Sequence, residues 1–229
     1  MIKLFPYLKR TVPYTLYLIP LFLLSCGSDP NGTPKPKGYF RIDLPEKHYT
    51  LYNNECPFSF EMPDYAVIEH DTNSIAEPCW INVNYQRFHA KLHLSYKPVN
   101  KNLDQYLQQS RSLAIQHQVK ASGMKESPVL NDSAKVYGLI YEFSGNAASS
   151  LQFYLTDTLH HFIRGALYFF ARPNSDSIAP VYDFLQKDIY HMIETFRWRN
   201  DVVLPETRSK IEMQRSKEGK EGEKKTGGH

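Results

Sequence analysis

Hydrophobic and polar residues alternate along several segments in the middle of the chain. Between residues 89 and 97, Ala90, Leu92, Leu94 and Tyr96 occupy every second position, and histidine, lysine and serine fill the others. Side chains two residues apart lie on the same face of a β-strand, so this spacing predicts a strand with one buried face and with His93 and its polar neighbours on a solvent-facing side. The same reasoning predicts strands over residues 137–143, 150–157 and 161–171, and earlier ones over 58–62, 65–70 and 80–85.

Two segments instead repeat their hydrophobic residues with the period of a helix. From Asn102, the positions that share one face are Leu103, Tyr106, Leu107, Ser110, Ala114 and His117. From Ser177, an expected N-cap with Pro180 in the first turn, the apolar face comprises Ile178, Val181, Tyr182, Leu185, Ile189, Ile193 and Phe196. We expect both helices to pack on a sheet.

The order of these elements predicts the fold class. Short turn-forming segments such as residues 156–158 separate the later strands, and strands joined by so short a turn run antiparallel. We therefore expect an α+β fold, a single domain with a mainly antiparallel sheet and two packed helices. The element order resembles the α/β/α sandwich of PsbP-like proteins.

The first 25 residues differ from the rest in being basic at the start and then almost uncharged. This layout, with an apolar run of roughly a dozen residues, is typical of a secretory signal peptide rather than a spanning helix, which needs about 20 apolar residues. The run ends in Leu23-Leu24-Ser25-Cys26, which resembles the lipobox of bacterial lipoproteins. In such sites a diacylglyceryl group is attached to the cysteine sulfur, so we expect lipidation at Cys26. An ordinary signal peptide or a short anchor with an incidental cysteine is the alternative.

Removal of this leader changes the charge of the protein. Lys3, Lys9 and Arg10 account for the whole formal net charge of +3, so the mature chain is neutral. A neutral chain argues against nucleic acid as a partner, because that binding needs a basic face. Membrane affinity then comes from the acyl chains, at about 0.8 kcal/mol for each buried CH₂.

Composition divides the chain into four parts. Residues 1–25 are the expected leader, and residues 26–37 combine the acylated cysteine with a tether rich in proline and glycine. Residues 38–204 are long enough for one domain with one core. Residues 205–229 mix lysine and glutamate with few aliphatic residues, which predicts a disordered charged tail.

Two cysteines remain in the expected domain, Cys56 and Cys79. Beyond the inner membrane the compartment is oxidising, so a disulfide between them is expected, and two buried free thiols are the alternative. The nine histidines suggest a metal site, but His89 and His93 would lie roughly 13 Å apart on a strand. No zinc-binding spacing accompanies them, so we expect neither a metal nor another cofactor.

The loop "SGNAASS" is the segment most suggestive of catalysis. Asn146, Ser149 and Ser150 could place hydroxyl groups and backbone donors around a carbonyl or an anion, but such a loop is more often simply a tight hairpin between two aromatic strands. No nucleophile elbow or phosphate-binding loop is present in the sequence. We expect a protein that is not an enzyme.

Arg164 interrupts an apolar strand, on the face that carries Phe162, Ala166, Tyr168 and Phe170. A buried charge needs a partner, so one interpretation is an ion pair with a carboxylate such as Asp157 or Asp188. The other is a recognition site framed by aromatic residues.

Several motifs together resemble one known family. They are "PKPKGYFRIDLPEKHY", "CPFSFEMPDYAVIE", "CWINV", "LHLSYK", "GNAASSLQF", "TDTLHHFIRGALYF" and "PNSDSIAPV". These segments, with the lipobox, are similar to the gliding motility lipoproteins of type D (GldD) of the Bacteroidota. The resemblance implies an envelope lipoprotein required for gliding and linked to the type IX secretion machinery, with other envelope proteins of that machinery as partners. It implies no catalytic residues.

The residues after the tether are the second candidate for contacts. Tyr39, Phe40 and Arg41 follow the prolines directly, with Ile42 beyond them. These aromatic residues either hold the chain against its own domain or form part of a docking surface. Because Gly27 follows the cysteine and only Asp29 adds an acidic residue nearby, we expect the periplasmic face of the outer membrane rather than the inner membrane.

Three functions remain as hypotheses at this stage. The first is a non-enzymatic accessory or scaffolding lipoprotein of the gliding and secretion machinery. The second is an envelope hydrolase that uses the loop from Asn146 to Ser150 with a histidine. The third is a binder of a small glycan or lipid, with Arg164 and neighbouring tyrosines in a cleft.

Overall fold

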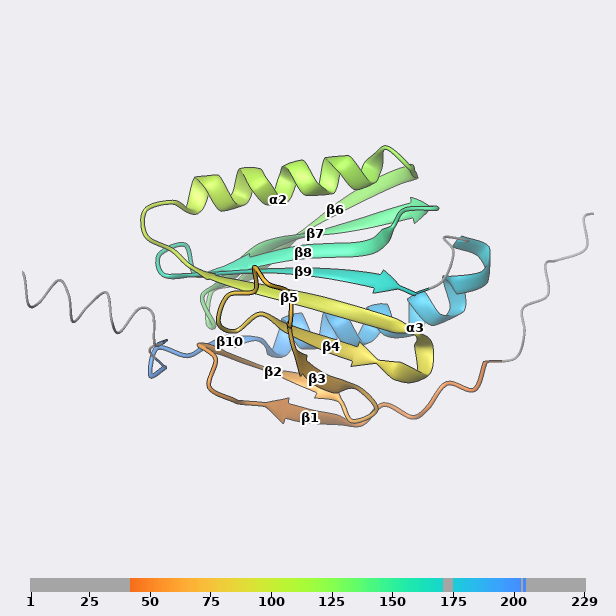
Figure 1. Cartoon of the computed structure of the whole chain (residues 1–229), viewed down its shortest axis with the longest axis horizontal. Coiled ribbons are helices and arrows are strands. Elements are labelled where there is room, and N and C mark those ends of the chain that lie inside the picture. Colours follow the sequence, from red (N-terminus) through yellow and green to blue (C-terminus); the bar gives the residue numbers. More distant parts are fainter. Residues whose placement is uncertain (1–41, 171–174, 203, 205–229) are drawn as a thin grey trace, which may run out of the picture. The chain divides into compact units, whose positions relative to one another are not determined.

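The largest element of the fold is an antiparallel sheet of seven strands, with the spatial order β3-β4-β5-β9-β8-β7-β6 (Figure 1). The structure, a computed structural model, describes residues 42–170, 175–202 and 204. The predicted leader, tether and tail lie outside these residues. The strands are β3 (Val67–His70), β4 (Ile81–Tyr85), β5 (Ala90–Pro98), β6 (Ala121–Asn131), β7 (Val136–Gly145), β8 (Ser149–Thr156) and β9 (His161–Phe169).

A second, smaller sheet and two long helices complete the described part. The small sheet has the order β1-β2-β10 and consists of β1 (Tyr49–Tyr52), β2 (Phe58–Pro63) and β10 (Arg197–Trp198). The helices are α2 (Leu103–Gln118) and α3 (Ser175–Thr195), and a 3₁₀ turn, η1 (Gln86–Phe88), precedes β5.

The helices cover opposite faces of the large sheet. Helix α2 lies along one face, and α3 lies on the other together with the small sheet (Figure 1). The main core fills the α3 side, where apolar residues of α3 pack against β2, β4, β5, β8 and β9. A smaller cluster on the other side joins Ala114 of α2 to Tyr141 and Phe143 of β7. The expected α+β fold, with an antiparallel sheet and two packed helices, is confirmed.

The two-residue alternation of β5 correctly identified the face that packs in the main core. In β7 the predicted face packs in the smaller cluster under α2 instead, and Val136 and Ile140 of its other face lie in the main core. Leu92 and Leu94 of β5 are buried in the main core, and each pairs across the sheet with the neighbouring strands β4 and β9. In β9 the small residue Gly165 is required, because a Cβ there would lie 2.2 Å from the ring of Phe153. Alternation, close packing and register therefore agree along the middle of the sheet.

Some elements differ from the sequence prediction. Strand β6 was not predicted, because its polar sequence and Pro128 are typical of a loop; at the sheet edge it needs only one neighbour, β7. The short strands β1 and β10 were also missed. Helix α3 begins at Ser175 rather than after a cap at Ser177, so Pro180 lies beyond its first turn.

A fully buried carboxylate, that of Asp188 in α3, joins several distant segments. It accepts a hydrogen bond from the hydroxyl of Tyr49 in β1 at 2.9 Å and others from Tyr65 and Lys47. Lys47 also donates to the carbonyl of Phe184 at 3.0 Å, and its Nζ lies 3.6 Å from the centre of that ring. Burial, followed by the hydrogen bond to Asp188 and by its charge, raises the pKa of both tyrosines, so their hydroxyls remain donors.

A buried histidine connects the β8–β9 turn to the end of the domain. Nδ1 of His161 lies 2.8 Å from the hydroxyl of Tyr96, and Nε2 lies 3.2 Å from Oδ1 of Asn200. The ring stacks on Trp198 with 5.1 Å between centres. Burial lowers the pKa of His161, so the imidazole is neutral at neutral pH.

Replacement of Asp188 should destabilise the fold, because it leaves the amine of Lys47 and the hydroxyls of Tyr49 and Tyr65 without a charged acceptor. We expect Asp188→Asn to lower the free energy of unfolding by about 2–3 kcal/mol, below the full cost of breaking a buried pair because Lys47 is partly exposed. Urea unfolding measures this, with Asp183→Asn, an exposed position of the same helix, as the control. A loss equal to that of the control would contradict the role of Asp188.

Stability should also fall as the pH drops below about 6.5. Burial lowers the pKa of His161, His93 and His117 from the usual 6.5, so the unfolded chain binds more protons than the folded one. Stability contributed by the neutral rings is therefore complete above pH 6.5 and is lost as the pH falls through the lowered values. Melting temperatures at about pH 7.5 and about pH 5.5 test this, above the range where most carboxylates titrate.

The matched variants for this pH effect are His161→Phe and His70→Gln. The first replaces a buried imidazole by a ring that does not titrate, so it should flatten the pH dependence of the melting temperature. The second removes an exposed imidazole and should leave that dependence unchanged. An unaltered slope in His161→Phe would show that this histidine does not cause the effect.

Candidate functional site

The candidate residues in and after the tether, Cys26, Tyr39, Phe40 and Arg41, lie outside the described residues. Ile42 and Leu44, which follow them, are exposed, at 36% and 44%.

The loop from Asn146 to Ser150 forms the hairpin between β7 and β8. Asn146 is exposed at its tip, whereas Ser149 is fully buried and its hydroxyl donates to the carbonyl of Leu151 at 3.2 Å. Ser150 lines a cavity of about 170 Å³ between the hairpin and the first part of α3. The described lining of this cavity, which also includes Phe143 and Tyr182, contains neither a histidine nor a carboxylate.

Arg164 lies in β9 on the face that α2 covers. Its Nη2 donates to Oε1 of Gln152 at 2.6 Å, and its guanidinium also bonds to the side chain of Tyr168. The interpretation that Arg164 forms an ion pair with Asp157 or Asp188 is wrong. Asp188 faces Lys47 on the opposite side of the sheet, and Asp157 accepts three backbone N–H groups in its own turn.

A cleft of about 270 Å³ opens beside Arg164, between α2 and the sheet. Strands β5 and β9 supply Ser95, Lys97, Phe162 and Arg164, and α2 supplies Tyr106, Gln109, Ser110 and Leu113. Trp80, just before β4, completes the wall. The structure thus brings Arg164 together with a tyrosine in a cleft, as the third hypothesis requires, although Trp80 and Lys97 were not among the predicted site residues.

Charges in this cleft are unevenly compensated. Lys97 pairs with Glu77 and lies 5.2 Å from the centre of the Trp80 ring. None of the ion pairs among the described residues involves Arg164. Among the described residues, the acceptors of this guanidinium are therefore all neutral.

The layer between the sheet and α2 is more polar than expected for a buried layer. Gln152 is only 1% exposed, and its Nε2 has no hydrogen-bond partner among the described residues. His93 was expected on a solvent-facing side of its strand; it is instead half-buried against Tyr168, with 5.5 Å between ring centres. Helix α2 covers this face, which the sequence pattern of β5 by itself could not indicate.

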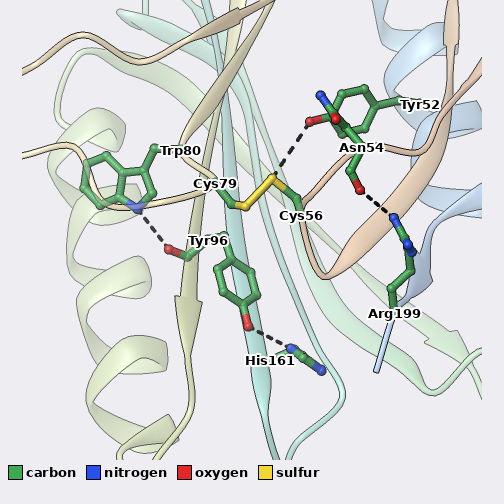
Figure 2. Close-up of a disulfide and its surroundings, with 8 residues drawn as sticks. All are labelled: Tyr52, Asn54, Cys56, Cys79, Trp80, Tyr96, His161 and Arg199. Carbon is green, nitrogen blue, oxygen red and sulfur yellow. Dashed lines mark hydrogen bonds between the residues drawn. A yellow bond between two sulfur atoms is a disulfide. The ribbon is translucent and has the colours of Figure 1, made fainter. Parts of the chain in front are cut away.

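A disulfide holds one wall of the cleft in place. Cys56, between β1 and β2, is bonded to Cys79, before β4, with 5.6 Å between their Cα atoms. Figure 2 shows Trp80 beside this bond on the side of α2, and its indole N–H donates to the carbonyl of Tyr96 at 2.9 Å. The bond links the small sheet to the large one and restrains the segment that carries Trp80.

Among the described residues, no group of three histidine, cysteine or acidic side chains is placed to hold a metal ion. Within the same residues, no helix has both the length and the hydrophobicity needed to cross a membrane.

Loss of the disulfide should destabilise the domain. Its 23-residue separation predicts a loss of about 3 kcal/mol in the free energy of unfolding when Cys56 and Cys79 are both replaced by alanine, because the unfolded chain gains freedom. Urea unfolding of this double variant and of the reduced native chain should agree. Two free thiols in the mass of the unreduced native protein would contradict the bond.

Comparisons with known proteins place the chain. No match to a curated protein was found. The solution structure of cyanobacterial PsbP (CyanoP) from Synechocystis sp. PCC 6803 matches with a TM-score of 0.37 and 10% identity, over 69% of this chain and 97% of that one.

A sequence model of the gliding motility lipoprotein GldD matches residues 29–198. The match covers well over half of the chain and includes every described strand and helix, and it begins three residues after the cysteine of the lipobox. The chain therefore belongs to the family of gliding motility lipoproteins GldD, which implies a membrane-anchored protein of the cell envelope.

Proposed function

We propose that this chain is an accessory or scaffolding component of the gliding and type IX secretion machinery of the Bacteroidota, and that it acts through contacts rather than catalysis. The family match carries this proposal, because it covers the predicted domain up to residue 198 and starts three residues after Cys26. Acyl chains on Cys26, palmitate among them, hold the protein at the periplasmic face of the outer membrane, where its partners are other envelope proteins of the same machinery.

The spacing between the anchor and the domain supports action at the membrane surface. Eleven residues, 27–37, separate the lipobox cysteine from the predicted start of the domain. Even a fully extended chain of this length reaches only ~40 Å. The domain therefore meets partners that lie close to the bilayer, and two or more acyl chains keep it there.

The hydrolase remains a separate hypothesis with a different requirement. It needs a nucleophile in reach of a base, and the hydroxyl of Ser149 is engaged by the carbonyl of Leu151. Ser150 lines a cavity, as does Ser144 at the start of the hairpin. If the loop were catalytic, a single substitution, Ser150→Ala, would abolish function.

The small-ligand hypothesis is favoured by one observation, the cleft beside Arg164. Its aromatic wall and its uncompensated guanidinium have the composition of a binding site. This function is compatible with a scaffolding role, since the cleft and the acyl anchor use different residues.

Removal of the acylated cysteine tests the main proposal. We expect Cys26→Ala to release the protein from membranes and to abolish colony spreading, because the domain loses its position beside its partners. Membrane fractionation, immunoblotting and spreading assays measure this, with Ser28→Ala, which leaves the lipobox intact, as the matched control.

The parallel variants Ser149→Ala and Ser150→Ala separate contacts from catalysis. Each should leave spreading nearly unchanged if the protein works by contacts, whereas a complete loss with normal protein levels favours the hydrolase. Full spreading by soluble, unacylated protein would refute the proposal.

A further inference from the structure

The guanidinium of Arg164 has a net charge that the described structure does not balance. Its two acceptors, Gln152 and Tyr168, are neutral, and a guanidinium has five N–H donors, more than these acceptors use. A partly buried cation is costly without an anion, and burial accordingly lowers the pKa of Arg164. The arrangement leaves room for one negatively charged partner.

Neighbouring groups do not supply that partner. Lys97 is the other cation of the cleft, and Glu77 neutralises it. Burial lowers the pKa of His93 and His117, so both rings on this face are neutral at pH 7. The cleft thus has an excess of about one positive charge, which a monoanion balances better than a dianion.

A second buried donor lies next to the guanidinium. The side chain of Gln152 accepts from Arg164 through Oε1, and this fixes its amide orientation. Its Nε2 is then a buried donor without a hydrogen-bond partner in the described part of the chain. Gln152 is not part of the described lining of the cleft, so Arg164 is the group that presents spare N–H donors to it, and an oxygen anion is the partner that suits them.

The remaining walls of the cleft are apolar and aromatic. Trp80 and Tyr106 line it with Phe162, and the indole N–H of Trp80 is already engaged by the carbonyl of Tyr96. These rings therefore offer carbon surface rather than donors. The volume of about 270 Å³ lies just below the range of sites for drug-sized molecules, so it suits a group the size of one amino acid.

We propose that this cleft binds a carboxylate attached to a small aromatic or branched apolar group. Arg164 pairs with the carboxylate, since its planar fork matches two carboxylate oxygens, and the rings of Trp80, Tyr106 and Phe162 contact the apolar group. Two sources share this chemistry: a free carboxylic acid, and the C-terminal residue of a partner protein. The proposed site does not use the acyl anchor. Refutation of the binding proposal would therefore leave the proposed role in motility intact.

The two tryptophans of the chain provide a direct readout. Trp80 lies in the cleft, whereas the indole N–H of Trp198 donates to the carbonyl of Lys135 outside it. The mature acylated chain, labelled with ¹⁵N-tryptophan and held in lipid nanodiscs, is titrated with N-acetylphenylalanine and with its uncharged primary amide. Trp80→Phe assigns the two indole signals.

We expect the acid to shift the Trp80 signal saturably, the amide to bind at least tenfold more weakly, and the Trp198 signal to stay in place. Arg164→Gln should abolish the shift. Arg87→Gln, which removes one exposed charge elsewhere, should retain it and so controls for net charge. If Arg164→Gln does not fold, the comparison of acid with amide on the native chain still tests whether the cleft requires a carboxylate.

No saturable shift of Trp80, equal binding of acid and amide, or full binding by folded Arg164→Gln would overturn the proposal. A five-residue peptide ending in phenylalanine separates the two sources. Binding at least tenfold tighter than N-acetylphenylalanine, lost on amidation of the peptide, assigns the site to a protein C-terminus. Equal binding assigns it to a free carboxylic acid.

Discussion

The buried carboxylate of Asp188 is the interaction on which the arrangement of the domain depends. It receives Tyr49 from the first strand, Tyr65 from the turn after β2 and Lys47 from the segment that enters the domain. A carboxylate without exposure is tolerated only when its partners are all in place. Helix α3 can therefore lie on the sheet in one position, in which Leu185 and its neighbours fill the main core.

The two faces of the large sheet consequently have different properties. The face under α3 is closed by the small sheet and is packed with aromatic and aliphatic side chains. The face under α2 is covered by one helix and retains polar groups, which include the buried Gln152 and, beside an open cleft, Arg164. The Cys56–Cys79 bond connects the two sides, since it joins the small sheet to the segment that positions Trp80. Stability thus comes mainly from one face, and the polar groups available for binding lie on the other.

Most regular elements were predictable because one face of each is buried against the core. The period of two in β5 and the helical period from Leu103 both follow from that burial, and the structure confirms them. Strand β6 escaped prediction because an edge strand needs no apolar alternation, and Pro128 is tolerated there. The polar residues of β5 suggested a solvent-facing side, because a local pattern does not show that a distant helix covers it.

By itself, the sequence determined the family, the main-core face of β5 and the packed faces of the two helices, and it predicted the lipidation of Cys26. The tertiary structure decided which charges meet. Arg164 and Asp188 were possible partners in the sequence, yet they lie on opposite faces of one sheet and face different neighbours. Side-chain periodicity follows from backbone geometry within a segment, whereas pairing between segments depends on strand order and on which helix covers which face, and these are set only when the whole core packs.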